Sequence, residues 1–139
     1  MLHDLLRDIR QCRVCEPALP LGANPVIQAH EAARILIIGQ APGIRVHQSS
    51  IPWNDPSGDL PPLWHQSVLA QLPNIQMTLL IGQYAQNYYL KDKPATLTET
   101  VRQWQRWAPH YLPLPHPSPR NTLWLKKNPW WLCCLNRWN

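Results

Sequence analysis

The sequence of 139 residues lacks the features that define several classes of protein. No apolar run reaches the roughly 18 residues of a membrane-spanning helix, and the polar N-terminus does not resemble a signal peptide. The chain also has no internal repeat, low-complexity tract or interdomain linker. These absences argue against a membrane protein or a repeat array. They predict a single domain over residues 1–139, located in the cytoplasm.

Phenylalanine is absent and glycine is scarce, with 5 residues against 16 prolines. The aromatic residues are 8 tryptophans and 4 tyrosines. Because proline restricts φ to a narrow range, so many prolines predict stiff loops that lose little entropy on binding. Acidic residues are also few, 8 against 13 basic ones, and the net charge of +5 favours anionic partners such as nucleic acids.

The sequence has only 4 cysteines. Thiols stay reduced in the cytoplasm, so structural disulfides are not expected. Cys12 and Cys15 have metal-ligand spacing, but a closed zinc or iron–sulfur site needs four ligands. Cys133 and Cys134 are adjacent, which would strain a site shared with the first pair. A zinc site formed by Cys12, Cys15 and histidines is an alternative that the spacing does not support.

Hydrophobic periodicity predicts helices that alternate with buried strands. Apolar residues repeat at helical spacing over 2–11, and apolar runs predict strands at 34–38, at 77–81 and at about 110–115. Further helices are predicted over 63–71, from 83 to about 90, from Thr96 or Thr98 through Trp107, and over about 122–127, with a loop from 40 to 58. Three apolar strands separated by helices predict an α/β domain with a parallel sheet covered on both faces.

The first predicted strand runs into a tight turn, Gly39–Gly43. Its glycines permit close approach of a ligand, and its free amides could hold a carbonyl or an anion. The third strand also ends in a polar cluster, His116–Asn121. In open α/β folds, ligands bind at the carboxyl ends of the strands. The alternative for the first turn is a structural role alone, because many α/β proteins turn with glycine and proline after a strand.

In the second cluster, prolines hold the backbone extended, so that His116 is presented in a fixed direction. Such a histidine could donate a hydrogen bond to an oxygen that gains negative charge as a base departs. Ser118 and Arg120 could bind phosphate oxygens. A solvated, proline-rich loop with an incidental histidine is the alternative.

Trp53 lies on a proline-containing loop after the first strand. It could stack on a base that has rotated out of a duplex, or it could pack as a core aromatic. Asp55 and Asp59 are the carboxylates nearest to Trp53 in this loop. Either could orient a water molecule, although capping and turn roles are commoner for aspartate.

Taken in sequence order, these motifs resemble the uracil-DNA glycosylase superfamily, and within it the bacterial branch similar to the iron–sulfur uracil-DNA glycosylases. The landmarks are Cys12-Arg-Val-Cys15, Leu21-Gly22, Ile35–Gly43, Ile51-Pro-Trp53, Ser57-Gly58, Leu79–Gln83 and His116–Asn121. The resemblance implies a three-layer α/β/α fold with a short parallel sheet. It also implies hydrolysis of the N-glycosidic bond between uracil and deoxyribose, through a transition state that resembles an oxocarbenium ion.

The resemblance further implies roles for single residues. His116 would stabilise the departing uracil anion, Trp53 would take the stacking position that the family usually fills with phenylalanine, and Asp55 is a candidate for orienting the water. The turn that would hold the uracil and the water consists of Gly39, Gln40, Ala41, Pro42 and Gly43. The residues that would bind the flanking phosphates are Ser118, Arg120 and Asn121.

Three departures from the family pattern change these expectations. Gln40 replaces the glutamate that serves the water, and an amide cannot act as a general base at neutral pH. After Asp59 there is no room for the family's next strand, which carries a uracil-reading residue and the second pair of cluster cysteines; the first strand would then have an exposed edge. The tail 130–139 ends where relatives continue as a helix. We therefore expect no iron–sulfur cluster, with Cys12 and Cys15 as orphan ligands.

The first functional hypothesis is a relative of the DNA-repair glycosylases whose activity is weak or lost, so that enzymatic activity is an open question. The alternatives are a nucleic-acid-binding domain without catalysis and a shortened product without function. The expected partner is DNA, either single-stranded or uracil-containing, and the expected state is a monomer.

Overall fold

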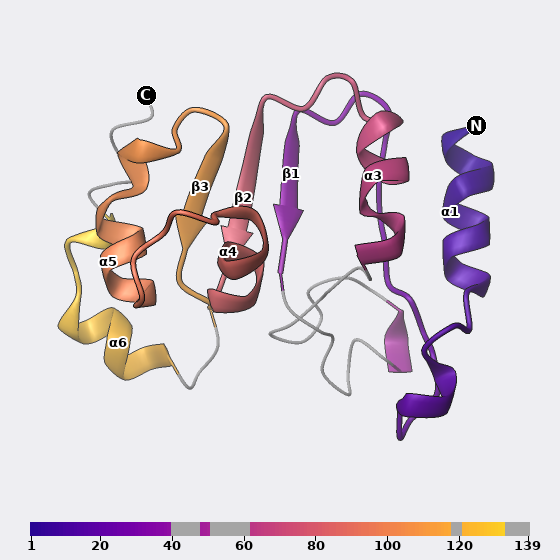
Figure 1. Cartoon of the computed structure of the whole chain (residues 1–139), viewed down its shortest axis with the longest axis horizontal. Helices are drawn as coiled ribbons and strands as arrows, with labels where there is room; N and C mark the ends of the chain where they lie inside the picture. The colour runs from indigo at the N-terminus through magenta and orange to yellow at the C-terminus, as the bar shows by residue number, and fades with distance from the viewer. Residues whose placement is uncertain (40–47, 51–61, 118–120, 133–139) are drawn as a thin grey trace.

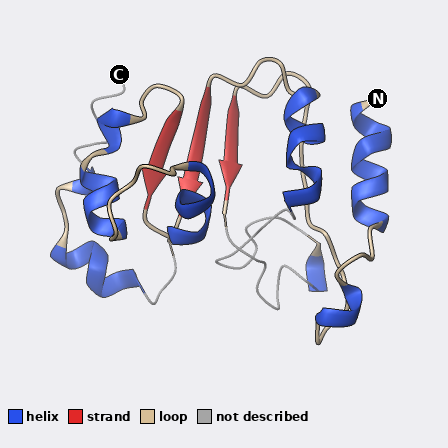
Figure 2. Cartoon of the chain, viewed as in Figure 1, coloured by secondary structure: helices blue, strands red, loops and turns tan. Residues whose placement is uncertain are grey.

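A computed structural model describes residues 1–39, 48–50, 62–117 and 121–132 of the chain. Its sheet has three parallel strands in the order β1-β2-β3, with helices around them (Figures 1 and 2). The described elements follow the chain as α1 (Leu2–Gln11), the 3-10 turn η1 (Glu16–Ala18), β1 (Ile35–Ile38), α3 (Pro62–Ala70), β2 (Met77–Ile81), α4 (Gln83–Tyr89), α5 (Leu97–Arg102), the 3-10 turn η2 (Trp104–Arg106), β3 (Tyr111–Leu114) and α6 (Thr122–Lys127). Within these ranges, no helix has the length and apolar character that a membrane crossing requires.

The strands are short apolar runs whose register places Ile38, Leu80 and Pro113 in one row across the sheet. The N–H of Thr78 donates to the carbonyl of His110 at 2.8 Å, so the backbone of His110 points toward β2. Because backbone groups alternate between the two sides of a strand, the backbone of Pro113 points away from β2. Proline is tolerated there, since an edge strand needs no N–H on its outer side.

Two apolar clusters hold the helices in place. In the first, Leu2, Leu6 and Ile9 of α1 pack with Val68 of α3 and with Leu72. In the second, Ala85 of α4 and Leu90, which directly follows α4, pack against Leu80 of β2. Figure 1 shows the resulting arrangement: α4 lies in front of the sheet, α5 and α6 lie beside β3, and α3 and then α1 lie beyond β1.

Most of the predicted elements are confirmed, including the α/β class, the parallel sheet, the helix 2–11 and the strand 77–81. Thr96 caps α5, and its Oγ1 accepts a hydrogen bond from the N–H of Glu99 at 3.2 Å. The prediction that this helix continues through Trp107 is wrong, because α5 ends at Arg102 and Trp107 packs in the second cluster instead. The prediction of a loop over 40–58 is also wrong at residues 48–49, which are helical.

The prediction that both faces of the sheet are covered holds at β3 and fails at β1. Ile37, Leu79 and Leu112 lie in one row and therefore on the same face. Leu112 is 4% exposed, whereas Ile37 is 48% exposed and Ile35 is 55% exposed. The described part of α3 packs with α1 and with Leu36, whose side chain lies on the opposite face of β1. This leaves the side chains of Ile35 and Ile37 half open to solvent.

Candidate functional site

Gly39 and His116, the first residues of the two polar motifs, lie at the same edge of the sheet. Gly39 follows β1, Gly82 follows β2 and His116 follows β3, and all three strands run in the same direction. Since neighbouring strands are about 4.8 Å apart, the ends of β1 and β3 are separated by about 10 Å. The structure therefore places Gly39 and His116 on the two sides of β2, at the carboxyl edge where ligands bind in folds of this kind.

His116 is the most unusual polar side chain at this edge. It is 5% exposed, and neither of its ring nitrogens has a hydrogen-bond partner within the described part of the chain. Burial lowers the pKa of His116 below its ordinary value of 6.5, because the charged imidazolium would lose its hydration. The imidazole is therefore neutral at pH 7, with one nitrogen as a donor and the other as an acceptor.

The backbone of His116 is held by Asn121. The Nδ2 group of Asn121, just before α6, donates to the carbonyl of His116 at 2.7 Å. This bond closes the loop that joins β3 to α6. Asn121 was predicted to bind phosphate; the structure shows that its amide holds the histidine loop, and the phosphate role stays a prediction.

Eight predicted site residues lie outside the described residues, as does Asp59. They are Gln40, Ala41, Pro42, Gly43, Trp53, Asp55, Ser118 and Arg120. The structure joins Asn121 to His116 and places the buried Gly39 at the same edge of the sheet, and the roles of all the predicted site residues stay predictions.

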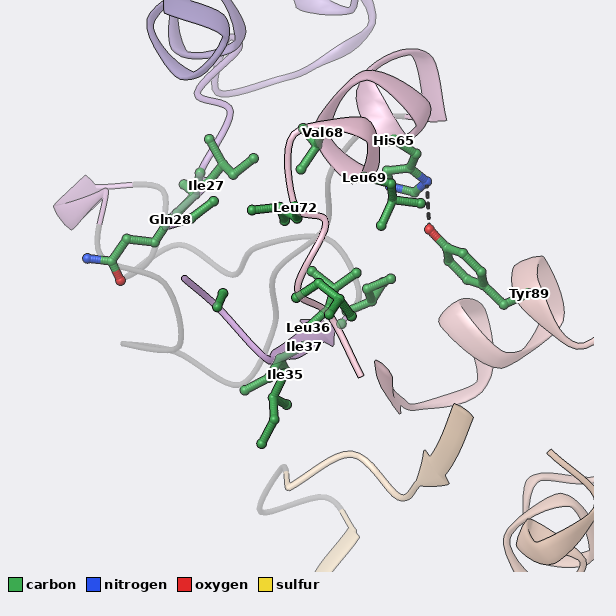
Figure 3. Close-up of a pocket in the computed structure, with 16 residues that line it drawn as sticks. Ile27, Gln28, Ile35, Leu36, Ile37, His65, Val68, Leu69, Leu72 and Tyr89 are labelled. Carbon is green, nitrogen blue, oxygen red and sulfur yellow. Dashed lines mark hydrogen bonds between the residues drawn. The ribbon is translucent and has the colours of Figure 1, made fainter. Parts of the chain in front are cut away.

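A cavity of about 330 Å³ lies on the β1 side of the molecule (Figure 3). Its walls are β1, the segment 26–29 and the side of α3 that carries Val68 and Leu69, and the buried Gly39 lies at its margin. The lining is mostly apolar. At one end, the hydroxyl of Tyr89 hydrogen-bonds with Nδ1 of His65 at 3.2 Å. His116 is not among the lining residues, so this cavity and the histidine are separate features of the edge.

Sequence reasoning did not find Gln86 or the pair of His65 and Tyr89. Gln86 lies in α4 and is fully buried, although glutamine is usually exposed on a helix. Its helix contains few apolar residues, and no local pattern marks the glutamine as an inward-facing side chain. Its place in the helix that begins directly after β2 and Gly82 is the one signal that could have drawn attention to it.

The described residues do not fit an iron–sulfur cluster. Such a cluster needs four thiolate ligands, and Cys12 and Cys15 are free thiols that no third His, Cys, Asp or Glu joins within the described ranges. The N–H of Val14, hydrogen-bonding to the Cys12 sulfur, lowers the pKa of that thiol. Cys133 and Cys134 lie outside the described residues. The absence of a cluster stays a prediction, and the chemistry below uses none.

A parallel sheet with proline-bounded polar loops at its carboxyl edge defines an α/β protein whose site lies at the strand ends. The sequence model of the uracil DNA glycosylase superfamily matches residues 61–138, more than half of the chain. The chain belongs to this superfamily. The match contains β2, β3 and the His116 loop, whereas β1 and the turn after Gly39 precede it. The bacterial branch and the missing strand stay predictions.

Proposed function

We propose that this protein excises uracil from DNA slowly, with His116 as the group that stabilises the departing base. The N-glycosidic bond breaks with its electron pair on the base, water adds to the sugar carbon, and the proton released from the water neutralises the base anion. A neutral imidazole can donate a hydrogen bond to the carbonyl oxygen that becomes negative. The observation that carries the proposal is the buried, neutral His116 at the carboxyl end of β3, whose ring nitrogens have no hydrogen-bond partner among the described residues.

The rate is expected to be low because the residue after Gly39 is Gln40. An amide cannot take a proton from water at neutral pH, and general-base catalysis typically contributes about 100-fold or more. Stabilisation of the base anion by His116 would remain. We therefore propose an enzyme that still stabilises the departing base but has no general base at position 40 to activate the attacking water.

Binding of DNA without excision is the second candidate function. The chain carries a net charge of +5, and Lys126 and Lys127 are exposed in the last turn of α6, the helix that follows the His116 loop. Arg102 lies over the ring of Trp130 at 5.0 Å, which adds a cation beside an aromatic surface. Basic side chains beside aromatic rings suit a nucleic-acid strand.

The test uses a labelled oligonucleotide with a single uracil, incubated with a large excess of protein and then treated with alkali, which cleaves the strand at an abasic site. We expect slow cleavage that a matched thymine oligonucleotide does not show. His116→Ala should lower the rate by about 100-fold or more, because it removes a donor to a developing anion. Unchanged excision in this variant would refute the role of His116. DNA binding without cleavage by the wild type would favour the second candidate.

A further inference from the structure

The end of β3 has few backbone donors of its own. Pro113, Pro115 and Pro117 alternate with Leu114 and His116, and proline has no N–H. Hydrogen bonds that anchor this part of the chain must therefore come largely from donors elsewhere. The direction in which the chain leaves the sheet before His116 thus depends on groups that donate hydrogen bonds to the carbonyls of this segment.

Gln86 supplies such donors. Its side chain is fully buried, and its Nε2 group donates to the carbonyl of Leu80 at 3.1 Å and to the carbonyl of Leu114 at 2.9 Å. The first carbonyl belongs to β2 and the second to the last residue of β3. The N–H of Gly82 also donates to Leu114 at 2.9 Å. The side chain of Gln86 thus ties the carboxyl ends of β2 and β3 together.

The orientation of this amide follows from its surroundings. Only the NH₂ end of a glutamine can face two carbonyl oxygens, because its own oxygen would repel them. The Oε1 atom is buried and has no hydrogen-bond partner within the described part of the chain. Buried acceptors without partners are uncommon in folded proteins. The two hydrogen bonds from Nε2 therefore fix the position of the amide, although its Oε1 atom has no partner among the described residues.

We propose that Gln86 is a positioning residue for His116, fixing the exit of the chain from β3 through the carbonyl of Leu114. The proposal rests on the function proposed above for His116. Gln86 holds the backbone before the histidine, and Asn121 holds the carbonyl of the histidine itself. Together they restrain the loop on both sides of the imidazole. The ring therefore stays buried and keeps one orientation at the sheet edge.

The test substitutes Gln86→Met, which keeps an unbranched side chain of similar length and removes both donors. The control is Thr100→Val, because Thr100 is also fully buried and donates from Oγ1 to the carbonyl of Thr96, the residue that caps α5, at 2.8 Å. Both variants lose a buried polar anchor. Only Gln86→Met should affect His116.

The first measurement is an NMR titration of the His116 ring, assigned among the 6 histidines by its loss in His116→Ala. We expect the pKa of His116 to rise toward 6.5 in Gln86→Met, as the loop opens and the ring is hydrated, and to stay lowered in Thr100→Val. An unchanged titration in Gln86→Met, or an equal change in both variants, would overturn the proposal. This measurement decides the matter even if the wild type excises nothing, which would count only against the proposed function.

If the wild type excises uracil, Gln86→Met should lower kcat by about 10- to 100-fold and leave KM within about twofold, since small displacements of a catalytic group are costly. A rise in KM with an unchanged kcat would contradict the positioning role. If Gln86→Met does not fold, exchange of the Gln86 side-chain amide protons in the wild type provides the test. Slow exchange supports the two bonds, and exchange at the rate of an exposed amide overturns them.

Discussion

The two ends of the same sheet edge differ in how the chain holds them. At β3, the strand end is tied to β2 through Gln86, the next loop is tied through Asn121, and His116 is buried. At β1, the side chains of Ile35 and Ile37 are half exposed, and the strand forms one wall of a mostly apolar cavity. The β3 end lies within the region that matches the superfamily, and the β1 end precedes it.

This difference separates the two parts of the proposed chemistry. In the proposed function, stabilisation of the departing base falls to the β3 end, where His116 is buried and its loop is held by hydrogen bonds. Activation of water needs a group of suitable pKa near the β1 end, where the sequence has Gln40. In this member of the superfamily, the β3 end of the sheet edge is well packed while the β1 end is more open to solvent.

The largest expected effect is on stability, from truncating one apolar residue of the central strand β2 and one of the edge strand β1. Leu80→Ala should lower the free energy of unfolding by about 3 kcal/mol, because Leu80 is fully buried between the sheet and α4. Ile37→Ala should cost about 1 kcal/mol or less, because Ile37 is 48% exposed. Urea unfolding followed by tryptophan fluorescence would measure both. Equal losses would mean that β1 is packed as tightly as β2 is against α4.

A smaller effect is expected from restoring a carboxylate at the β1 end. Gln40→Glu should raise the rate of uracil excision by about tenfold or more, since it supplies a general base for water. Gln83→Glu is the control: Gln83 is exposed just after β2, and its substitution changes the net charge equally. Single-turnover assays on the uracil oligonucleotide would compare them. An equal gain in both variants would point to charge alone.

The smallest expected effect is the change in thermal stability with pH. Burial lowers the pKa of His116 in the folded protein, so below the ordinary value of 6.5 the unfolded chain binds the proton more readily. Stability should therefore fall as the pH drops below 6.5. His116→Gln should show a smaller decrease in Tm between pH 7.5 and pH 5.5 than the wild type. Parallel Tm curves for the two proteins would show that the buried imidazole makes no contribution.

Part of the fold and of the site was predictable because it depends on local patterns. The helical spacing of Leu2, Leu6 and Ile9 predicts α1, and the apolar run 77–81 predicts β2 with its observed bounds. The prolines around His116 predict a stiff loop after a strand. Parallel strands share a carboxyl edge, so the sequence also placed Gly39 and His116 at one edge of the sheet.

Other features depend on contacts between distant residues, which no local pattern contains. Gln86 is buried because α4 lies over the seam between β2 and β3, where two carbonyls accept its amide. Trp107 leaves the predicted helix because packing in the core outweighs helical propensity. The apolar run around Ile37 predicts a buried side chain, and only the arrangement of the helices leaves that side chain half exposed.

The sequence by itself determined which segments become strands and helices, and which chemistry-bearing residues follow them, because periodicity and proline placement act over a few residues. The tertiary structure decided how deeply each end of the sheet edge is buried and which side chains restrain His116. Burial and hydrogen-bond partners are set by elements that meet in space, such as α4 with the ends of β2 and β3. Burial lowers the pKa of His116, and the function proposed for this histidine depends on that burial.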